Sequence, residues 1–240
     1  MEAESSFSAY LKQEESGALT FGGARMVMLD VLSGFWGIRR QVEALVGTQL
    51  AGMVLQQAGA NGGASFAQSL VGGKSEDPPG AFRDCLAAYQ AAGFGRFEIQ
   101  RMDPGLFTAE DPGGKRVIVR GQNNFEAWAA DRHDAAGEPV CGYTSGVLVG
   151  FINVISGRGD LVCRETACKA AGGDGCTFEL LRVEESDETA VVNYAPDPGL
   201  GRKVKLLELL FERMPMGIAI LDADYHIRRF NPTWHDFEKL

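Results

Sequence analysis

Apolar side chains recur every three or four positions in the first part of the chain, which is the spacing of one face of an α-helix. We expect this helix to begin near Arg25 and to end at Gly47, after residues 1–20, which read as a polar arm. Two shorter helices are predicted over residues 50–57 and 62–71. The positions that mark the first helix are Met28, Val31, Phe35, Ile38, Val42 and Leu45.

The middle of the chain combines helices with short strands. An amphipathic helix is predicted over residues 81–92, after a charged turn that contains prolines, and a second over residues 124–132. Residues 143–155 are apolar and interrupted by glycines, which favours a buried helix that a neighbour approaches closely. Strands are predicted over residues 95–102, 106–110, 115–120, 160–165 and 177–183, with a hairpin-type turn at 111–114. These elements predict an α+β fold, with helices packed on a largely antiparallel sheet.

The pattern changes after about residue 184. An acidic segment ends in a stretch rich in proline and glycine, and residues 203–214 follow as an amphipathic helix. This linker helix is suited to joining two copies of the chain as a homodimer, or equally to covering its own domain. After Pro215 the pattern predicts a strand, a turn at 222–225 and a second strand, with Asn231 and Pro232 opening a new element.

Composition and charge narrow the class of protein. The 240 residues are 45% hydrophobic, which is enough for one core and part of another. A formal charge of −9 argues against direct contact of this segment with nucleic acid, because phosphate binding requires clustered Lys and Arg. No apolar run reaches transmembrane length, and the first residues lack the features of a signal peptide. We therefore expect a cytoplasmic protein with no membrane contact.

Four of the five cysteines lie between residues 141 and 176. Two of them, Cys168 and Cys176, flank the glycine-rich turn AAGGDG, an arrangement that can fold back onto one ion. With a carboxylate and a more distant thiolate they would complete a closed tetrahedral zinc shell, which stabilises structure and performs no hydrolysis. The alternative is that these are buried, inert thiols, as we expect for Cys85. Cys163 and Glu165 would share one side of a strand, so either is a candidate fourth ligand.

The chain resembles the 4-vinyl-reductase-type small-molecule-binding domain over roughly residues 21–182. The residues that carry the resemblance are the segment from GARMVMLDVL to GGASFA, the NNFEA motif at 123–127, and PVC followed by E-x-x-C-x₇-C. Such domains are best known as sensors at the N-terminus of sigma-54-dependent activators that respond to phenols and xylenes. The resemblance implies a structural Zn²⁺ held by Cys141, Glu165, Cys168 and Cys176. In the same way, the last residues resemble the first hairpin of a PAS domain, too short here to form its core.

A ligand cavity of this kind would be lined mostly by apolar and aromatic groups. In the phenol sensors a histidine on the helix before the first sheet strand binds the hydroxyl group, and Tyr89 occupies that place here. The tryptophan that those sensors carry before the NNFEA-like motif is absent, which puts phenol specificity in doubt. The candidate lining residues are Tyr89, Phe97, Phe107, Phe125, Trp128 and Tyr143.

These observations predict a sensory domain of a bacterial signalling or transcription regulator rather than an enzyme, since no nucleophile–base pair is evident. It would bind a small, mostly apolar effector and relay occupancy to a C-terminal output domain, by resemblance a sigma-54-dependent activator. A sensor kinase or diguanylate cyclase output, a tetrapyrrole-related reductase or accessory protein, and an interaction scaffold are the alternatives. The predicted domains are an arm (1–20), the sensor (21–183), the linker (184–214) and a truncated PAS-like segment (215–240).

Overall fold

The computed structural model describes residues 7–108, 113–133 and 137–182, and then 211, 213, 216, 218–221, 226–231 and 233. The chain divides into two compact units, residues 1–195 and 196–240, and each is described by itself. The predicted linker over residues 184–214 lies outside the described residues apart from Phe211 and Arg213. The domain boundaries expected near residues 183 and 214 therefore stay predictions.

The first described residues form a small antiparallel sheet, where the sequence predicts a polar arm. Its elements are α1 (Phe7–Tyr10), β1 (Leu11–Gln13), β2 (Leu19–Phe21) and β3 (Ala24–Met26), in the strand order β1-β2-β3. The helix predicted to start near Arg25 is also wrong there, because β3 occupies those residues. Phe21 explains both differences: its ring is buried, 6.1 Å from the ring of Phe66, so it attaches the segment to the main helix.

The main helix, α3 (Thr48–Val71), is one continuous element where the sequence predicts two short ones. It follows a π-helical turn, η1 (Val31–Phe35), and α2 (Trp36–Val46), with Gly47 as the joint. The glycines that the sequence places at helix boundaries instead face another helix. A Cβ at Gly59 would lie 2.1 Å from the backbone oxygen of Tyr143, so glycine is required there by close packing.

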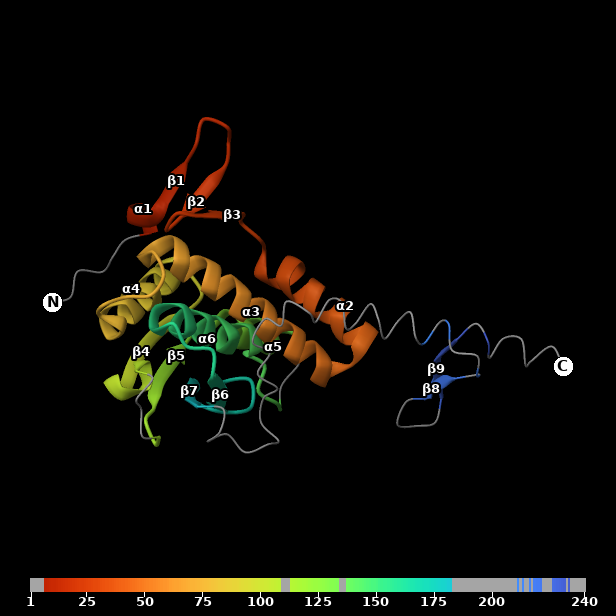
Figure 1. Ribbon diagram of the computed structural model, residues 1–240. Coiled ribbons are helices and arrows are strands. Elements are labelled where there is room, and N and C mark those ends of the chain that lie inside the picture. Colours follow the sequence, from red (N-terminus) through yellow and green to blue (C-terminus); the bar gives the residue numbers. More distant parts are fainter. Residues whose placement is uncertain are drawn as a thin grey trace. The chain divides into compact units, whose positions relative to one another are not determined.

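The partner of α3 is α6 (Gly142–Ser156), the buried helix that the sequence predicts over residues 143–155. Its own glycines complete the close approach. A Cβ at Gly146 would lie 1.9 Å from the backbone oxygen of Gln56, and one at Gly150 would lie 2.3 Å from that of Ala60. The predicted role of the glycines is confirmed. Figure 1 shows α3 and α6 side by side in the centre of the domain, with α4 (Pro78–Ala91) and α5 (Phe125–Arg132) nearby.

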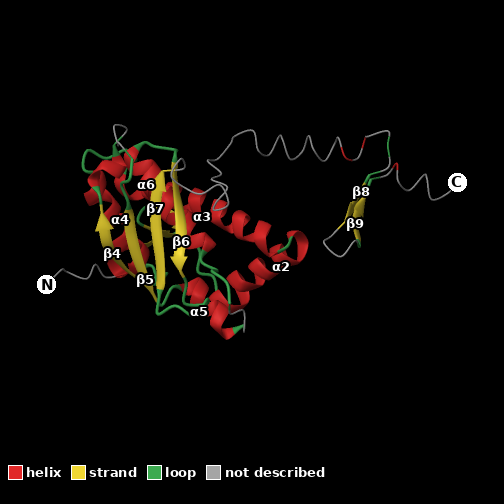
Figure 2. Ribbon diagram, turned by 90° about the horizontal axis from the view of Figure 1, so that it is seen from below, coloured by secondary structure: helices red, strands yellow, loops and turns green. Residues whose placement is uncertain are grey.

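The main sheet is antiparallel throughout and confirms the α+β fold class. Its strands are β4 (Arg96–Met102), β5 (Val117–Gln122), β6 (Leu161–Ala167) and β7 (Cys176–Arg182), in the order β4-β5-β7-β6. Figure 2 shows the sheet with helices α4 and α6 behind it. The core lies between these layers and includes Phe82, Phe151 and Phe178, none of them exposed.

The strand predicted over residues 106–110 is wrong in its described part. Residues Pro104–Phe107 form a short 3₁₀-helix, η2, that follows β4. Pro104 supplies no backbone N–H for a sheet ladder and suits the start of a helical turn. Leu106 and Phe107 are buried in the core, so their apolar character reflects packing and not strand pairing. Of the predicted turn at 111–114, only residues 113 and 114 are described.

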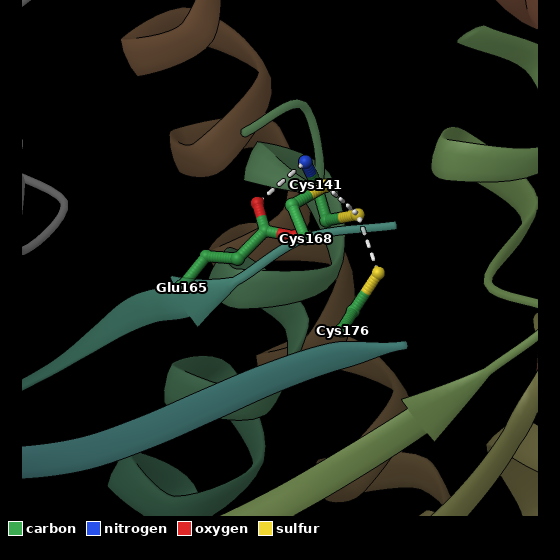
Figure 3. A group of neighbouring side chains, drawn as sticks. All are labelled: Cys141, Glu165, Cys168 and Cys176. Atoms are coloured by element: carbon green, nitrogen blue, oxygen red, sulfur yellow. Dashed lines mark hydrogen bonds between the residues drawn. The ribbon is translucent and has the colours of Figure 1, made fainter. Parts of the chain in front are cut away.

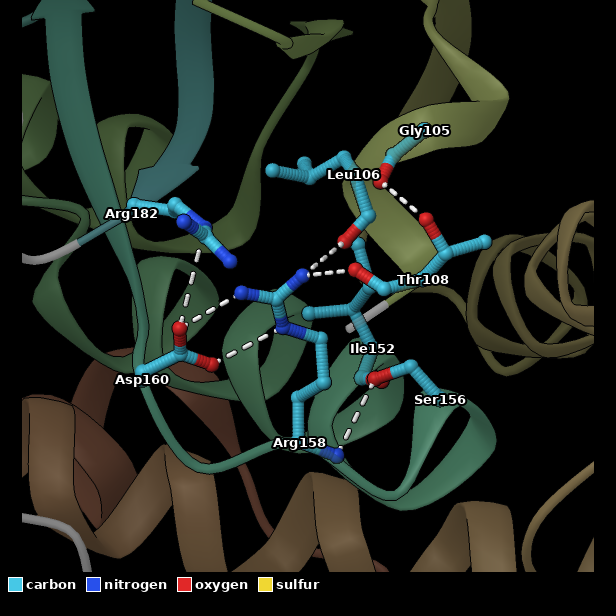
Figure 4. Close-up of polar contacts among 8 residues, drawn as sticks. All are labelled: Gly105, Leu106, Thr108, Ile152, Ser156, Arg158, Asp160 and Arg182. Carbon is cyan, nitrogen blue, oxygen red and sulfur yellow. Dashed lines mark hydrogen bonds and ion pairs between the residues drawn. The ribbon is translucent and has the colours of Figure 1, made fainter. Parts of the chain in front are cut away.

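Arg158 joins the end of α6 to η2 (Figure 4). Its guanidinium donates to the backbone oxygens of Leu106 and Thr108 and forms an ion pair with Asp160, with 2.5 Å between Nη2 and Oδ2. Arg182 lies on the other side of that carboxylate, 3.8 Å away. The two arginines hold the pKa of Asp160 below its ordinary value. These contacts fix the loop between α6 and β6.

The C-terminal unit contains the predicted strand–turn–strand. β8 (Ala219–Leu221) pairs with β9 (Ile227–Phe230) in antiparallel register, and the turn between them lies outside the described residues. Asn231 is buried; its side chain accepts a hydrogen bond from the N–H of Ile218 and donates to the oxygen of Met216, both at 2.9 Å. The hairpin is thus confirmed, whereas its assignment to a PAS domain stays a prediction.

Candidate metal centre and ligand cavity

Cys141, Glu165, Cys168 and Cys176 lie together at one end of the sheet (Figure 3). Their ligand atoms are all within 4.8 Å of one another. Each comes from a different element: the residue that precedes α6, strand β6, the turn after it, and the first position of β7. The cluster therefore joins the start of the central helix to the β6–β7 hairpin.

The turn between Cys168 and Cys176 folds as its composition suggests. Two backbone N–H groups, those of Ala171 and Gly173, donate to the oxygen of Cys168 at 3.1 and 2.9 Å. Gly172 has a φ of 90°, a conformation that L side chains rarely adopt. Arg120 on β5 forms an ion pair with Asp174 at 2.6 Å, which ties the turn to the sheet.

The spacing of these atoms fits a tetrahedral metal ion. With zinc–sulfur bonds of about 2.3 Å, the sulfur atoms of a tetrahedral site lie about 3.8 Å apart. The distances from the sulfur of Cys141 are 3.6 Å to Cys176 and 3.9 Å to Cys168. One carboxylate oxygen of Glu165 accepts the N–H of Cys141 at 2.9 Å, while the other, Oε1, is buried without a hydrogen-bond partner. A cation would satisfy that atom, so the donor set fits a metal.

Burial and mutual contact perturb the protonation of this cluster. Burial raises the pKa of Cys141, while hydrogen bonds from Cys141 and Cys176 lower the pKa of Cys168. Burial, with the nearby Cys168 sulfur, raises the pKa of Glu165 to about 8. A bound divalent cation would hold the thiols as thiolates. Since four protein ligands close the shell, its contribution would be to fix structure.

Cys163 and Cys85 lie outside this cluster. Both are buried, and burial raises the pKa of each, to about 12 for Cys85. Ser145 on α6 hydrogen-bonds the Cys163 thiol. The sequence left Cys163 and Glu165 as alternatives, and the structure brings Glu165 to the other three residues. A shift in register between Glu165 and Ala167 accompanies the turn of the chain at this point.

A second feature is a cavity of about 190 Å³. It is bounded by the N-terminal sheet, by α3, by the end of α4 and by α6. Aromatic rings form most of its wall, and Ser65 and Arg25 are exposed at its edge. Within the described chain, its lining includes no Asp, Glu, His or Cys. The aromatic lining residues are Phe21, Phe66, Tyr89, Phe94, Tyr143 and Phe151.

The structure brings two of the predicted lining residues, Tyr89 and Tyr143, to this cavity. Phe97 lies behind Tyr89, with 5.3 Å between ring centroids, and Phe125 packs edge-on against Phe94. Phe107 packs against Phe82 in the core, and the Trp128 ring carries the Arg132 guanidinium at 3.8 Å. These four residues do not line the cavity.

Sequence reasoning missed four aromatic lining residues: Phe21, Phe66, Phe94 and Phe151. Phe66 and Phe151 stand on the facing helices α3 and α6, with 6.0 Å between their rings. The glycines around them were the available signal, because close helix packing leaves space for large rings beside it. Nothing in the sequence indicated that Phe21 would reach across from the N-terminal sheet.

The NNFEA motif holds α5 and α6 together. The Asn124 side chain caps α5 and donates to the hydroxyl of Thr144 at 2.9 Å. The Tyr89 hydroxyl lies 3.4 Å from that same hydroxyl. Glu126 is buried and accepts the N–H groups of Tyr143 and Thr144 at the start of α6. The motif thus positions Tyr89 and Tyr143 at the cavity.

Burial raises the pKa of Glu126 from 4.5 to about 7, against the opposing hydrogen bonds from Thr144 and Tyr143. Because the folded-state pKa is the higher one, its contribution to stability is complete below pH 4.5 and is lost as the pH rises through 7. The whole change amounts to roughly 3 kcal/mol. Urea unfolding at pH 5 and pH 8 should show a loss of stability that is larger by about this amount in the wild type than in Glu126→Gln. Equal losses would contradict this assignment.

Comparison with known proteins places these features in a class. Residues 125–182 match the family model of the vinyl-4-reductase domain. This stretch contains the NNFEA glutamate, α6 and all four residues of the metal cluster. The resemblance to a 4-vinyl-reductase-type domain that the sequence predicts is therefore confirmed. A search of curated protein sequences gave no match.

Among solved structures, the chain is similar to the phenol-responsive sensory domain of the transcription activator PoxR, solved with phenol. The TM-score is 0.64 at 18% identity, over 75% of this chain and 89% of that one. It is also similar to a vinyl-4-reductase family protein from Methanocaldococcus jannaschii, with a TM-score of 0.40 at 18% identity, over 62% and 80% of the two chains. The first likeness shows that the fold is shared. No helix in the part of the chain described here has the length and apolarity to span a membrane.

Proposed function

We propose that residues 21–183 form a sensor domain that binds a small, mostly apolar effector, aromatic in character. The observation that carries this proposal is the cavity of about 190 Å³ walled by six aromatic rings. An apolar cavity of about 150 Å³ is enough to bind benzene. The PoxR domain that shares the fold responds to phenol, which supports the same use of the fold here.

In this proposal the domain recognises its effector without making or breaking bonds. The absence of acidic, histidine or cysteine side chains from the described lining supports this view, because acid–base and nucleophilic catalysis need such groups near the substrate. The metal cluster stands apart from the lining and would hold the start of α6 in place. We propose Zn²⁺ as the ion, on the basis of its three cysteines and one carboxylate.

Signalling requires the effector to bind one arrangement of the domain better than another. The cavity is bounded by β3, α3, α4 and α6, so a ligand contacts elements from the first third to the last third of the domain. We propose that the linker over residues 184–214 relays occupancy to a following output, with a PAS-like segment from residue 215, in a cytoplasmic homodimer. A sigma-54-dependent activator is the output that the PoxR likeness favours.

The proposal is tested by thermal unfolding of the full chain with phenol, benzyl alcohol, m-xylene and related compounds. At a ligand concentration about 100 times its dissociation constant, stabilisation is about 2.7 kcal/mol. For a unit of this size the midpoint should rise by about 5–10 °C. A panel in which no compound raises the midpoint would contradict the proposal.

A matched pair of variants locates the binding site. Ser65 is exposed at the edge of the cavity, so Ser65→Trp should fill the space without disturbing the core, and the thermal shift should be lost. Gln68→Trp is the control, since Gln68 is exposed on the same helix and does not line the cavity. A shift that persists in Ser65→Trp would place the ligand elsewhere.

A further inference from the structure

The helix α3 carries no charged residue along its 24 positions. The uncharged stretch extends further, from residue 44 to residue 73. One side of α3 is buried against α6, at Ala51, Leu55 and Ala67. The other side is exposed at Leu50, Val54, Ala58, Ser65 and Ser69, positions that follow the spacing of one helix face.

Large apolar side chains stand exposed on this side of the molecule. Leu45, at the end of α2, is 83% exposed, and Ile38 is 54% exposed one face-repeat earlier. Leu50 and Val54, on the first turns of α3, are each 45% exposed. We refer to these four residues and Ala58 as the α2–α3 face. Large apolar residues gathered on a soluble domain indicate an interaction site.

We propose that the α2–α3 face pairs with the same face of a second copy of this chain. A two-fold interface of this kind needs only one patch, used by both copies. The exposed positions of α3 repeat mostly at i and i+4, and such ridges interdigitate when two helices cross. The small residues Ala58 and Ser65 permit a close approach of the two backbones.

Charge favours a second copy over other occupants. Each copy has a formal charge of −9, so two copies repel over most surfaces, and a neutral face is where they approach at least cost. Nucleic acid and anionic lipid surfaces both require Lys or Arg, and residues 44–73 contain none. This interface is distinct from the linker-mediated pairing proposed above.

The face also borders the ligand cavity. Gly62 and Ser65 line the cavity and are exposed on α3 next to the apolar positions. A second copy on this face would therefore lie beside the opening of the cavity. The test below uses protein without any effector, so its result does not depend on whether the domain is a sensor.

Light scattering coupled to gel filtration of the full chain measures the outcome. The wild type should have a mass of about 52 kDa, twice the 25.8 kDa of one chain, and dissociate only on dilution. Val54→Glu and Leu50→Glu each bury a charge in the interface and should shift the mass to that of one chain at equal concentration. Both residues are exposed within the single chain, so circular dichroism should be unchanged.

Met216→Glu is the control, because Met216 is 58% exposed in the C-terminal unit and lies outside the face. It should leave the mass of the dimer unchanged. A monomeric wild type overturns the proposal, as does a dimer that survives both Val54→Glu and Leu50→Glu. Leu210→Glu, in the predicted linker helix, identifies the competing interface if it alone produces monomers.

Discussion

Replacing Cys168 by serine should release the metal and lower the melting midpoint of the domain by roughly 10 °C. Cys168 is buried between Cys141, Cys176 and Glu165, and their ligand atoms lie within 4.8 Å of one another. An ion bound at about 1,000 times its dissociation constant contributes about 4 kcal/mol. For a unit of this size, that free energy corresponds to a change of about 8–16 °C. Elemental analysis should fall from one zinc per chain to nearly none.

Cys163→Ser is the control for this experiment. Cys163 is as deeply buried as Cys168 and lies on the same hairpin, but it is not a member of the cluster. The variant should retain its zinc. If Cys163→Ser lost the metal while Cys168→Ser kept it, the choice of Glu165 over Cys163 as the fourth ligand would be wrong.

Replacing Gly59 by alanine should destabilise the domain by about 3 kcal/mol or more. The added methyl would lie 2.1 Å from the backbone oxygen of Tyr143, and a backbone atom cannot move aside as a flexible side chain can. Helices α3 and α6 would have to separate, which also distorts the cavity between them. Chemical denaturation measures the loss of free energy of unfolding.

Gly52→Ala provides the matched control on the same helix. No atom lies within 4 Å of a Cβ at Gly52, so the change removes only the helix penalty of glycine. We expect it to stabilise the domain by about 0.5–1 kcal/mol. Equal effects of the two substitutions would contradict the close α3–α6 packing.

The metal cluster could be predicted from the sequence because its ligands are marked by type and spacing. Cysteines on either side of a glycine-rich turn indicate a shared ion, and family resemblance supplied Cys141 and Glu165. The strands of the main sheet were predictable for a similar reason, since β-branched runs such as that of β5 are local signals. Both features are encoded by residues close together in the sequence.

Long-range packing was harder to predict. Gly59 and Gly62 look like helix boundaries in the sequence and become packing positions only when α6 lies against α3. Phe21 lies among polar residues and is buried only because Phe66 receives it. The aromatic cavity wall depends on these same contacts, so single residues such as Tyr89 and Tyr143 could be predicted but the complete lining could not.

The most direct test is to locate a bound effector by nuclear magnetic resonance, with whichever aromatic compound raises the melting midpoint most. The account predicts nuclear Overhauser contacts from the bound compound to the rings of Tyr89, Tyr143 and Phe151, with the compound recovered unchanged. Contacts confined to other parts of the chain, or conversion of the compound to a product, would contradict it.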